Sequence, residues 1–458
     1  MTAYLAPSAL LPDGWASDVL IETGEDGAIS AVTKGGEADG AERLAGPVIP
    51  GMPNLHSHAF QRAMAGLAET AANPSDDFWT WRDLMYRFLG RLGPEEMEAV
   101  AAQLYLEMLK AGYTAVGEFH YVHNAPDGTP YDDPAELSRR IIAAARRAGI
   151  GITHLPVLYA QGGFDGRELA GGQRRFANEP AGILAIVAEL RKAHADDSNI
   201  RLGVAPHSLR AVAPEQLAEL VAGAWAEDGM APIHIHVAEQ TREVEDCRAW
   251  SGARPVEWLL AHAPVDGRWC LIHATHMTPA ETRGLAASDA VAGLCPSTEA
   301  NLGDGLFALT DYLAADGVLG VGSDSHIGID PAEELRLLEY GQRLTLRRRS
   351  VTRLDGPSIG AGLYRAALAG GAQAMGRDIG RIAKGARADF VVLDPDHPAL
   401  VEREGDALLD ALIFAATGPT PVRDVMVGGR WRVKEGHHED EEDVLNLYRA
   451  TVRKLKDG

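Results

Sequence analysis

The sequence predicts an α/β protein in which a (β/α)₈ TIM barrel carries a small β-sandwich domain formed by both chain ends. Three observations lead to this fold: short apolar runs alternate with longer amphipathic runs through the middle of the chain, the apolar runs number eight, and both ends hold β-like segments without helices between them. Strands that alternate with helices form βαβ units in a parallel sheet, and eight such units close into a barrel.

The eight expected strands follow one another along the central part of the chain. They are PVIPGMPN (47–54), YTAVGEF (113–119), IGITHLPVLY (150–159), RLGVAPH (201–207), PIHIHVAE (232–239), WCLIH (269–273), AVAGLC (290–295) and GVLGVGSD (317–324). Between most of them lie helical patterns that begin with Pro and are rich in Ala, Leu and Glu, such as PEQLAELVAGAWAE. In such a barrel the functional site lies at the C-terminal ends of the strands.

These patterns divide the chain into three parts. Residues 1–46 are expected to form the N-terminal part of the β-sandwich domain, and residues 47–381 the barrel. Residues 382–458 are expected to form the C-terminal part of that domain, followed by a closing helix in EEDVLNLYRATVRKLKDG.

The composition excludes several classes of partner. The 458 residues include 43 Lys+Arg and 65 Asp+Glu, which gives a formal net charge of −22. This excess argues against a nucleic-acid partner and against an anionic membrane surface, since both need a basic surface. We find no apolar run of about 18 residues, so no membrane span is expected. An anionic small molecule can still bind if a few arginines gather in one pocket.

The three cysteines, Cys247, Cys270 and Cys295, lie far apart and form no CxxC pair. They cannot build a disulfide framework, which favours a reducing cytoplasm as the location. Any metal is therefore expected to bind to histidine and carboxylate rather than to thiolate.

The segment NLHSHAF places His56 and His58 on either side of one serine, after the first expected strand. Residues two apart in a strand point the same way, so both imidazoles can reach one point. An HxH pair alone is weak evidence, but His236, His273 and Asp324 end other expected strands. Because strand ends converge in a barrel, three histidines and one aspartate can form a set of zinc ligands with one position left for water or substrate.

This pattern resembles the amidohydrolase superfamily, which has HxH after strand one, His after strands five and six, and Asp after strand eight. The similarity covers essentially the whole chain, and HVAE adds the HxxE signature of the deaminase branch. The resemblance implies one Zn²⁺ per subunit, two proton-handling residues in addition to Asp324, and a homodimer. The implied zinc ligands are His56, His58, His236 and Asp324, and the implied proton-handling residues are His273 and Glu239.

Three alternatives about the metal stay open at this stage. His234 competes with His236 as a ligand, although the spacing to Glu239 favours His236. Glu118, at the end of the second strand, leaves room for a second metal site. A set of three histidines and one aspartate also accepts iron or manganese.

These residue types suit a hydrolytic deamination. Zinc lowers the pKa of bound water to about 7. His273 and Asp324 are expected to orient that water and accept its proton, while Glu239 delivers a proton to the substrate nitrogen. Attack on an sp² carbon that bears nitrogen then releases ammonia.

Cationic and polar side chains near the same strand ends indicate the substrate class. Two arginines among them favour carboxylate recognition, because guanidinium binds carboxylate through two parallel hydrogen bonds. A purine deaminase would need fewer cations. The five candidates are Gln61, Arg82, Tyr121, His207 and Arg210.

The set NLHSHAFQRAMAGLAE, WTWRDLMYRF, EFHYVHN, PHSLRAV, HIHVAEQ and GSDSHIGID is similar to the superfamily members that act in bacterial histidine degradation. This resemblance implies hydrolysis of N-formimino-L-glutamate, a small-molecule dicarboxylate, to N-formyl-L-glutamate and ammonia, with those five residues as substrate contacts. The histidines near the same rim are interpreted as supporting or structural residues: His120, His123, His276 and His326.

Two other functions fit parts of this pattern. Another deaminase of the superfamily, acting on guanine, a triazine or an adenosine derivative, would share the metal and differ only in the pocket. A catalytically silent barrel serving as a binding protein is disfavoured, because all six residues of the expected metal and proton-transfer set are present.

Overall fold

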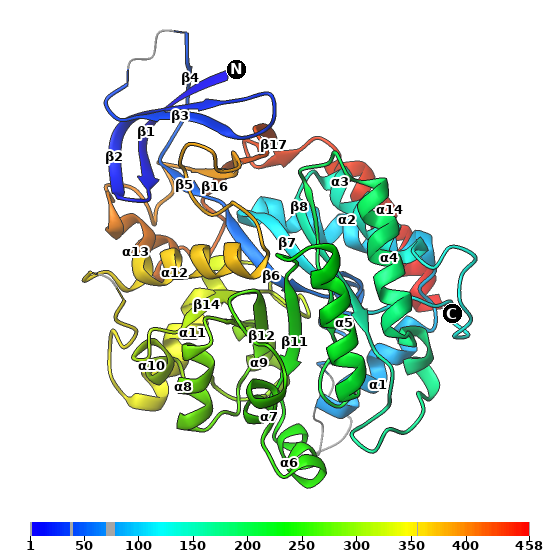
Figure 1. Cartoon of the computed structure of the whole chain (residues 1–458). Coiled ribbons are helices and arrows are strands. Elements are labelled where there is room, and N and C mark those ends of the chain that lie inside the picture. Colours follow the sequence, from blue (N-terminus) through cyan, green and yellow to red (C-terminus); the bar gives the residue numbers. More distant parts are fainter. Residues whose placement is uncertain (1, 37–39, 70–77, 355, 458) are drawn as a thin grey trace.

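In the computed structural model, which describes residues 2–36, 40–69, 78–354 and 356–457, parallel strands close into a barrel (Figure 1). Two sheets, ordered β10-β8-β7-β6 and β11-β12-β13-β14, are joined by the isolated parallel bridges Ser57–Asp324 and Val204–Ile233. The barrel strands are β6 (Met52–Ser57), β7 (Tyr113–His120), β8 (Gly151–Leu158), β9 (Ile200–Leu202), β10 (Ala205–Pro206), β11 (Ile233–Val237), β12 (Trp269–His273), β13 (Val291–Leu294) and β14 (Val318–Val321).

Helices surround this barrel, and many of them begin with proline, whose missing N–H falls where a helix leaves its donors unpaired. The α-helices are α1 (Phe78–Leu89), α2 (Pro94–Ala111), α3 (Glu136–Ala148), α4 (Pro180–Ala193), α5 (Pro214–Glu227), α6 (Thr241–Ser251), α7 (Pro255–His262), α8 (Pro279–Ala287), α9 (Pro296–Leu302), α10 (Leu309–Leu313), α11 (Pro331–Leu346), α12 (Ile359–Ala374), α13 (Asp406–Phe414) and α14 (Glu441–Asp457). Two 3₁₀ helices, η1 (Ala59–Met64) and η2 (Gly171–Phe176), lie in loops. None of the helices in the described ranges is both long and apolar enough to cross a membrane.

The two chain ends pair in one sheet, as expected for the small β domain (Figure 1). Its strand order is β18-β17-β16-β15-β5-β1-β2-β3, with β4 beside β1. A separate apolar core fills it, where the ring of Tyr4 lies 6.2 Å from Phe390 and 5.5 Å from Trp431. The strands are β1 (Thr2–Leu11), β2 (Gly14–Thr23), β3 (Ile29–Thr33), β4 (Glu42–Arg43), β5 (Val48–Pro50), β15 (Phe390–Leu393), β16 (Val422–Val427), β17 (Arg430–Lys434) and β18 (His437–His438).

The prediction of one strand over residues 47–54 is wrong, because the run divides at Gly51. Its first half, β5, pairs with β1 and β15 in the end sheet, whereas its second half, β6, pairs with β7 in the barrel. The chain passes too close to Thr114 for any side chain here, since a Cβ on Gly51 would lie 2.1 Å from the Thr114 side chain. The run 201–207 also divides after β9, but both of its halves, β9 and β10, pair with β8 in the barrel. At the break, a Cβ on Gly203 would lie 2.4 Å from the Pro232 oxygen.

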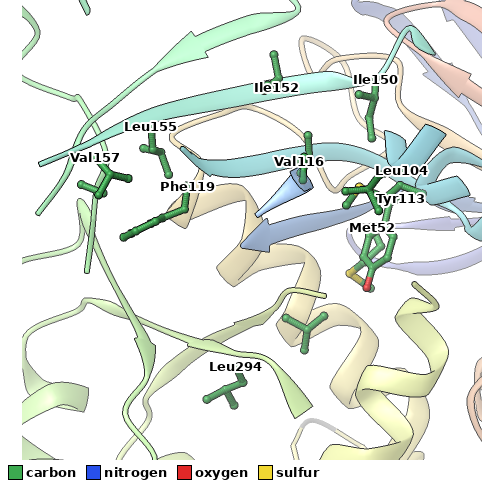
Figure 2. Packing of buried hydrophobic residues seen from close by; sticks show 14 of the residues in the cluster. Met52, Leu104, Tyr113, Val116, Phe119, Ile150, Ile152, Leu155, Val157 and Leu294 are labelled. Carbon is green, nitrogen blue, oxygen red and sulfur yellow. The ribbon is translucent and has the colours of Figure 1, made fainter. Parts of the chain in front are cut away.

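The main core lies inside the barrel and beneath its helices. Figure 2 shows part of it, where side chains of β7 and β8 pack with residues of β6, α2 and β13. Phe119 is the member of this core nearest the end of β7. Its ring centre lies 4.3 Å from that of His236 and 5.1 Å from that of His56. Apolar packing therefore fixes the imidazoles from below and keeps water away from that side.

Candidate active site

The structure brings four of the expected ligands together at the C-terminal ends of the barrel strands. His236 Nε2 lies 3.1 Å from His56 Nε2 and 3.3 Å from His58 Nε2. Asp324 Oδ1 lies 3.4 Å from His56 Nε2 and 3.3 Å from His58 Nε2. The donor atoms of these four residues thus point at one small volume at the ends of β6, β11 and β14. The group His56, His58, His236 and Asp324 is called the metal cluster, meaning a cluster of potential metal ligands.

The protonation of these imidazoles suits a bound cation. Burial lowers the pKa of His56 to about 3 and lowers the pKa of His58 and His236, so all three are neutral at pH 7. His58 Nδ1 lies 2.9 Å from the Phe119 carbonyl and His236 Nδ1 lies 3.1 Å from the His207 carbonyl. A carbonyl only accepts, so both Nδ1 atoms carry hydrogen, and both Nε2 lone pairs face the centre. Converging lone pairs with a carboxylate fit a zinc ion.

Two groups suited to proton transfer lie beside this cluster. His273 Nε2 is 3.8 Å from Glu239 Oε1 and 3.8 Å from Asp324 Oδ2. Burial disfavours a charged His273, but the carboxylates of Glu239, Glu299 and Asp324 outweigh it and raise the pKa of His273 to about 10. Burial raises the pKa of Glu239 to about 7, so its carboxyl can both hold and release a proton near neutral pH.

Two buried glutamates that sequence reasoning missed support these groups. Glu299, on α9, has Oε1 3.3 Å from His273 Nδ1 and accepts the Cys295 N–H at 3.0 Å. Glu243, on α6, accepts the N–H groups of Ala238 and Glu239, each at 3.1 Å. Both act from helices that follow the strands. Nothing in the sequence marks Glu299, and Glu243 has only its place four residues after Glu239.

The backbone at these strand ends is strained. Ala238, His273 and Asp324 have positive φ angles of 52°, 68° and 46°. The left-handed region costs a residue with a side chain roughly 1 kcal/mol or more, so surrounding contacts must enforce it. At Asp324 they do so through the Asp324 N–H, which donates to the His56 carbonyl at 3.0 Å, and through the His58 N–H, which donates to the Asp324 carbonyl at 3.2 Å.

Glu118 turns away from the metal cluster, which removes the reason to expect a second metal there. Its carboxylate accepts hydrogen bonds from the Ser57 hydroxyl at 2.5 Å, the Ala59 N–H at 2.8 Å and the Tyr105 hydroxyl at 3.0 Å. His326 Nε2 lies 3.1 Å from the same Ser57 oxygen. Glu118 and His326 therefore hold the backbone of the HxH segment in place from behind.

Replacing Glu118 by glutamine is expected to change how stability depends on pH. Burial raises the pKa of Glu118 from 4.5 to about 7, so the folded protein binds this proton more tightly than the unfolded chain. The free energy of unfolding therefore falls between pH 4.5 and 7, by roughly 3 kcal/mol for a shift of this size. Urea unfolding of the metal-free protein at pH 5 and pH 8 should show this fall in the parent but not in Glu118→Gln. The exposed Glu219→Gln serves as the control, and equal falls in all three proteins would contradict the prediction.

All five expected substrate contacts line one cavity that opens onto the metal cluster and Glu239. Gln61 Nε2 donates to the Tyr121 hydroxyl at 2.9 Å, and Arg210 Nη1 donates to the Tyr159 hydroxyl at 3.2 Å. His207 Nδ1 lies 3.1 Å from the Ser208 hydroxyl. Arg82 has its guanidinium carbon 5.6 Å from the ring centre of Tyr86, which lines the same cavity.

The other histidines do not face this cavity. His234 lies two residues earlier on β11 than His236, and its Nε2 lies 2.7 Å from the Ala374 carbonyl, so His236 is the one of the two that reaches His56 and His58. His123 Nε2 lies 2.9 Å from the Val157 carbonyl, and the ring of His120 packs 5.4 Å from that of His154. His276 belongs neither to the cavity lining nor to the metal cluster among the described residues.

Several aromatic and apolar lining residues were missed by sequence reasoning. Tyr159 directly follows β8, so the same strand-end rule that selects His236 and His273 would have found it. The others come from α1, η2 and α9, whose approach to the barrel mouth is not visible in local sequence. They are Trp81, Met85, Tyr86, Phe176 and Leu302.

Comparison with family models agrees with this geometry. The model described as Amidohydrolase family matches residues 48–432. A second model, described as the N-terminal domain of formimidoylglutamate deiminase HutF, matches residues 1–46.

Individual proteins are similar over all or most of the chain. Formimidoylglutamate deiminase of Pseudomonas aeruginosa is 57% identical over 458 residues, with 100% of both chains covered. A 5-methylthioadenosine/S-adenosylhomocysteine deaminase of Natronomonas pharaonis is 29% identical, covering 92% of this chain and 89% of that protein. The crystal structure of an amidohydrolase from Brucella melitensis is 48% identical and matches with a TM-score of 0.94 over 100% of both chains.

Proposed function

The chain belongs to the amidohydrolase family, and from this premise we propose how its cavity hydrolyses N-formimino-L-glutamate to N-formyl-L-glutamate and ammonia. The full-length 57% identity to formimidoylglutamate deiminase carries this conclusion and assigns the reaction to histidine degradation. The enzyme is a hydrolase of a C–N bond in a linear amidine. Its site residues, its metal and its subunit arrangement are the proposals that follow.

The cavity suits a substrate with an amidine at one end and two carboxylates. Arg82 and Arg210 line it together with the metal cluster. Arg210 has no carboxylate within 4.0 Å among the residues that the structure describes, so its guanidinium is available to a substrate carboxylate. We propose Gln61, Arg82, Tyr121, His207 and Arg210 as the substrate contacts.

We propose one Zn²⁺, held by His56, His58, His236 and Asp324. The neutral imidazoles and the carboxylate support this choice, since three nitrogens and one oxygen are a common zinc donor set. Iron or manganese could bind to the same donors. When bound, such an ion lowers the pKa of water toward 7 and so supplies a nucleophile at neutral pH.

The residues around the cluster then move the protons. Asp324 accepts the first proton of the attacking water, whose oxygen forms a bond to the amidine carbon. His273, which the surrounding carboxylates hold protonated with a pKa of about 10, orients that water. Glu239 delivers two protons in turn to the terminal nitrogen, and both come from the water: one is released on attack, and the other when the C–OH group becomes the formyl C=O. The C–N bond then breaks and ammonia leaves. Glu299 holds His273 and Glu243 holds the backbone of Glu239, which keeps both groups oriented during transfer.

Ammonia release from N-formimino-L-glutamate by the purified protein tests the whole proposal. Guanine and adenosine serve as control substrates, because other deaminases share the metal chemistry and differ in the pocket. We expect turnover of the formimino compound alone, with loss of activity on chelation. A zinc-loaded protein that releases ammonia from a purine but not from the formimino compound would overturn the substrate assignment.

Replacing Arg210 by methionine is expected to lower kcat/KM for N-formimino-L-glutamate by about 100-fold or more, mainly through KM. The variant keeps an unbranched apolar stem but cannot pair with a carboxylate, and a charge-assisted hydrogen bond contributes about 1.5–3 kcal/mol. Steady-state kinetics with metal analysis check this result. Arg242→Met, on the exposed start of α6, is the matched control. An unchanged KM, or a loss of metal in Arg210→Met, would speak against a direct substrate contact.

The cellular setting is proposed on narrower grounds. Cys247, Cys270 and Cys295 are free and buried, which suits a reducing cytoplasm. We propose the small dicarboxylate substrate as the partner. We also propose a homodimer, on the basis of family membership alone.

A further inference from the structure

Tyr159 holds a fixed position at the mouth of the barrel. It follows the last residue of β8, lines the cavity with Arg210 and Glu239, and is 2% exposed. Its ring centre lies 4.5 Å from that of His207 and 5.4 Å from that of Phe176. Packing on both sides fixes the ring, so the phenol oxygen has one place in the cavity wall.

The hydrogen-bond partners of this oxygen determine what its own hydrogen can do. Arg210 Nη1 lies 3.2 Å from it and Gln173 Nε2 lies 3.1 Å from it. Guanidinium nitrogens only donate. The amide of Gln173 is also fixed, because its Oε1 accepts the Ala170 N–H at 3.3 Å, which turns the NH₂ group toward Tyr159. The phenol oxygen therefore accepts from both neighbours.

A phenol that accepts two hydrogen bonds still has one O–H to donate. No acceptor for the Tyr159 hydroxyl hydrogen is found among the described residues. A buried donor of this kind is costly unless something in the cavity accepts from it. The neighbouring Arg210 has no carboxylate partner within 4.0 Å in the described part of the chain. Its guanidinium therefore also needs an acceptor from the cavity.

We propose that Tyr159 is a substrate-binding residue whose hydroxyl donates to the same substrate carboxylate that Arg210 binds, with Gln173 holding the phenol in the donating orientation. This inference rests on the proposed function, since it assumes a carboxylate substrate. One oxygen of the carboxylate receives guanidinium hydrogens and the other receives the phenol hydrogen. The pair Tyr159–Arg210 thus favours a carboxylate over an uncharged group of similar size.

The test replaces Tyr159 by phenylalanine, which keeps the ring and its packing and removes only the hydroxyl. We expect KM for N-formimino-L-glutamate to rise so that kcat/KM falls about 10- to 100-fold, with kcat and metal content unchanged. Tyr340→Phe, the same change on the surface of α11, is the control, because its ring stacks on Phe414 outside the cavity.

Two truncated substrates separate a carboxylate contact from a structural effect. The formimino derivative of 4-aminobutyrate lacks the α-carboxylate, and that of L-2-aminobutyrate lacks the side-chain carboxylate. One of these two substrates lacks the carboxylate that Tyr159 contacts. With that substrate the parent and Tyr159→Phe should have equal kcat/KM. With the other truncated substrate, Tyr159→Phe should show the same fall in kcat/KM as with N-formimino-L-glutamate.

The outcomes distinguish this inference from the proposed function. Equal losses with all three substrates would overturn the carboxylate contact and leave Tyr159 as a packing residue. Unchanged kinetics in Tyr159→Phe would overturn it as well. A parent protein that does not release ammonia from N-formimino-L-glutamate would instead refute the proposed function, before any variant is compared.

Discussion

Replacing His236 by alanine is expected to remove the bound metal and to lower kcat/KM for N-formimino-L-glutamate by about 10³-fold or more. His236 is the imidazole that links the other two, with its Nε2 3.1 Å from His56 Nε2 and 3.3 Å from His58 Nε2. Without it the remaining donors come only from β6 and the end of β14, and they no longer surround the centre. Metal analysis of the purified variant and single-substrate kinetics measure both effects.

His234 provides the matched control for this prediction. It stands two residues earlier on the same strand, is also buried, and has its Nε2 2.7 Å from the Ala374 carbonyl. We expect His234→Gln to lose some stability but to keep one metal ion per folded chain. If His234→Gln lost the metal while His236→Ala kept it, the ligand assignment on β11 would be wrong.

The strand ends account for most of what the sequence could predict about the site. One rule, that the C-terminal ends of parallel barrel strands converge, selected the histidines and Asp324. Glu239 and the division into ligands and proton-handling residues came instead from the resemblance to the amidohydrolase superfamily. The structure brings all of these residues together. The same rule applied to the third strand would have selected Tyr159. Its aromatic character, typical of a core position, hid a hydroxyl that has a specific place in the cavity.

The parts of the site that depend on backbone strain could not be predicted. His273 and Asp324 have positive φ angles, which nothing in the local sequence signals and which tertiary contacts enforce. Glu243 and Glu299 act from α6 and α9 through backbone and ring hydrogen bonds, so their roles require the helices to be in place. The division of the first strand at Gly51 likewise depends on Thr114, which is distant in sequence.

Charge alone gave only a weak prediction of the substrate. With a net charge of −22 the surface should repel a dicarboxylate, so recognition must come from local cations. Arg210 supplies one inside a cavity where it meets a phenol rather than a carboxylate. A protein with many acidic side chains can bind an acidic substrate in this way, because salt screens a partly buried ion pair much less than an exposed one.

Replacing Glu239 by glutamine is expected to lower kcat by about 10²- to 10⁴-fold, the usual contribution of a positioned acid or base, with the metal retained and KM little changed. Glutamine has the same shape but cannot carry a proton to the leaving nitrogen. Burial raises the pKa of Glu239 to about 7, so the fraction that is protonated falls as pH rises through that value. The kcat of the parent should therefore decline on the alkaline side with an apparent pKa near 7.

Glu239→Gln should lack this alkaline decline, since its amide does not titrate. The exposed Glu245→Gln on α6 carries the same chemical change outside the cavity and should keep both kcat and the pH profile of the parent. A Glu239→Gln enzyme with kcat within about 2-fold of the parent would exclude Glu239 from proton delivery. His273 would then be the remaining group near the nitrogen, because its Nε2 lies 3.8 Å from both Glu239 and Asp324 and three carboxylates hold its pKa near 10.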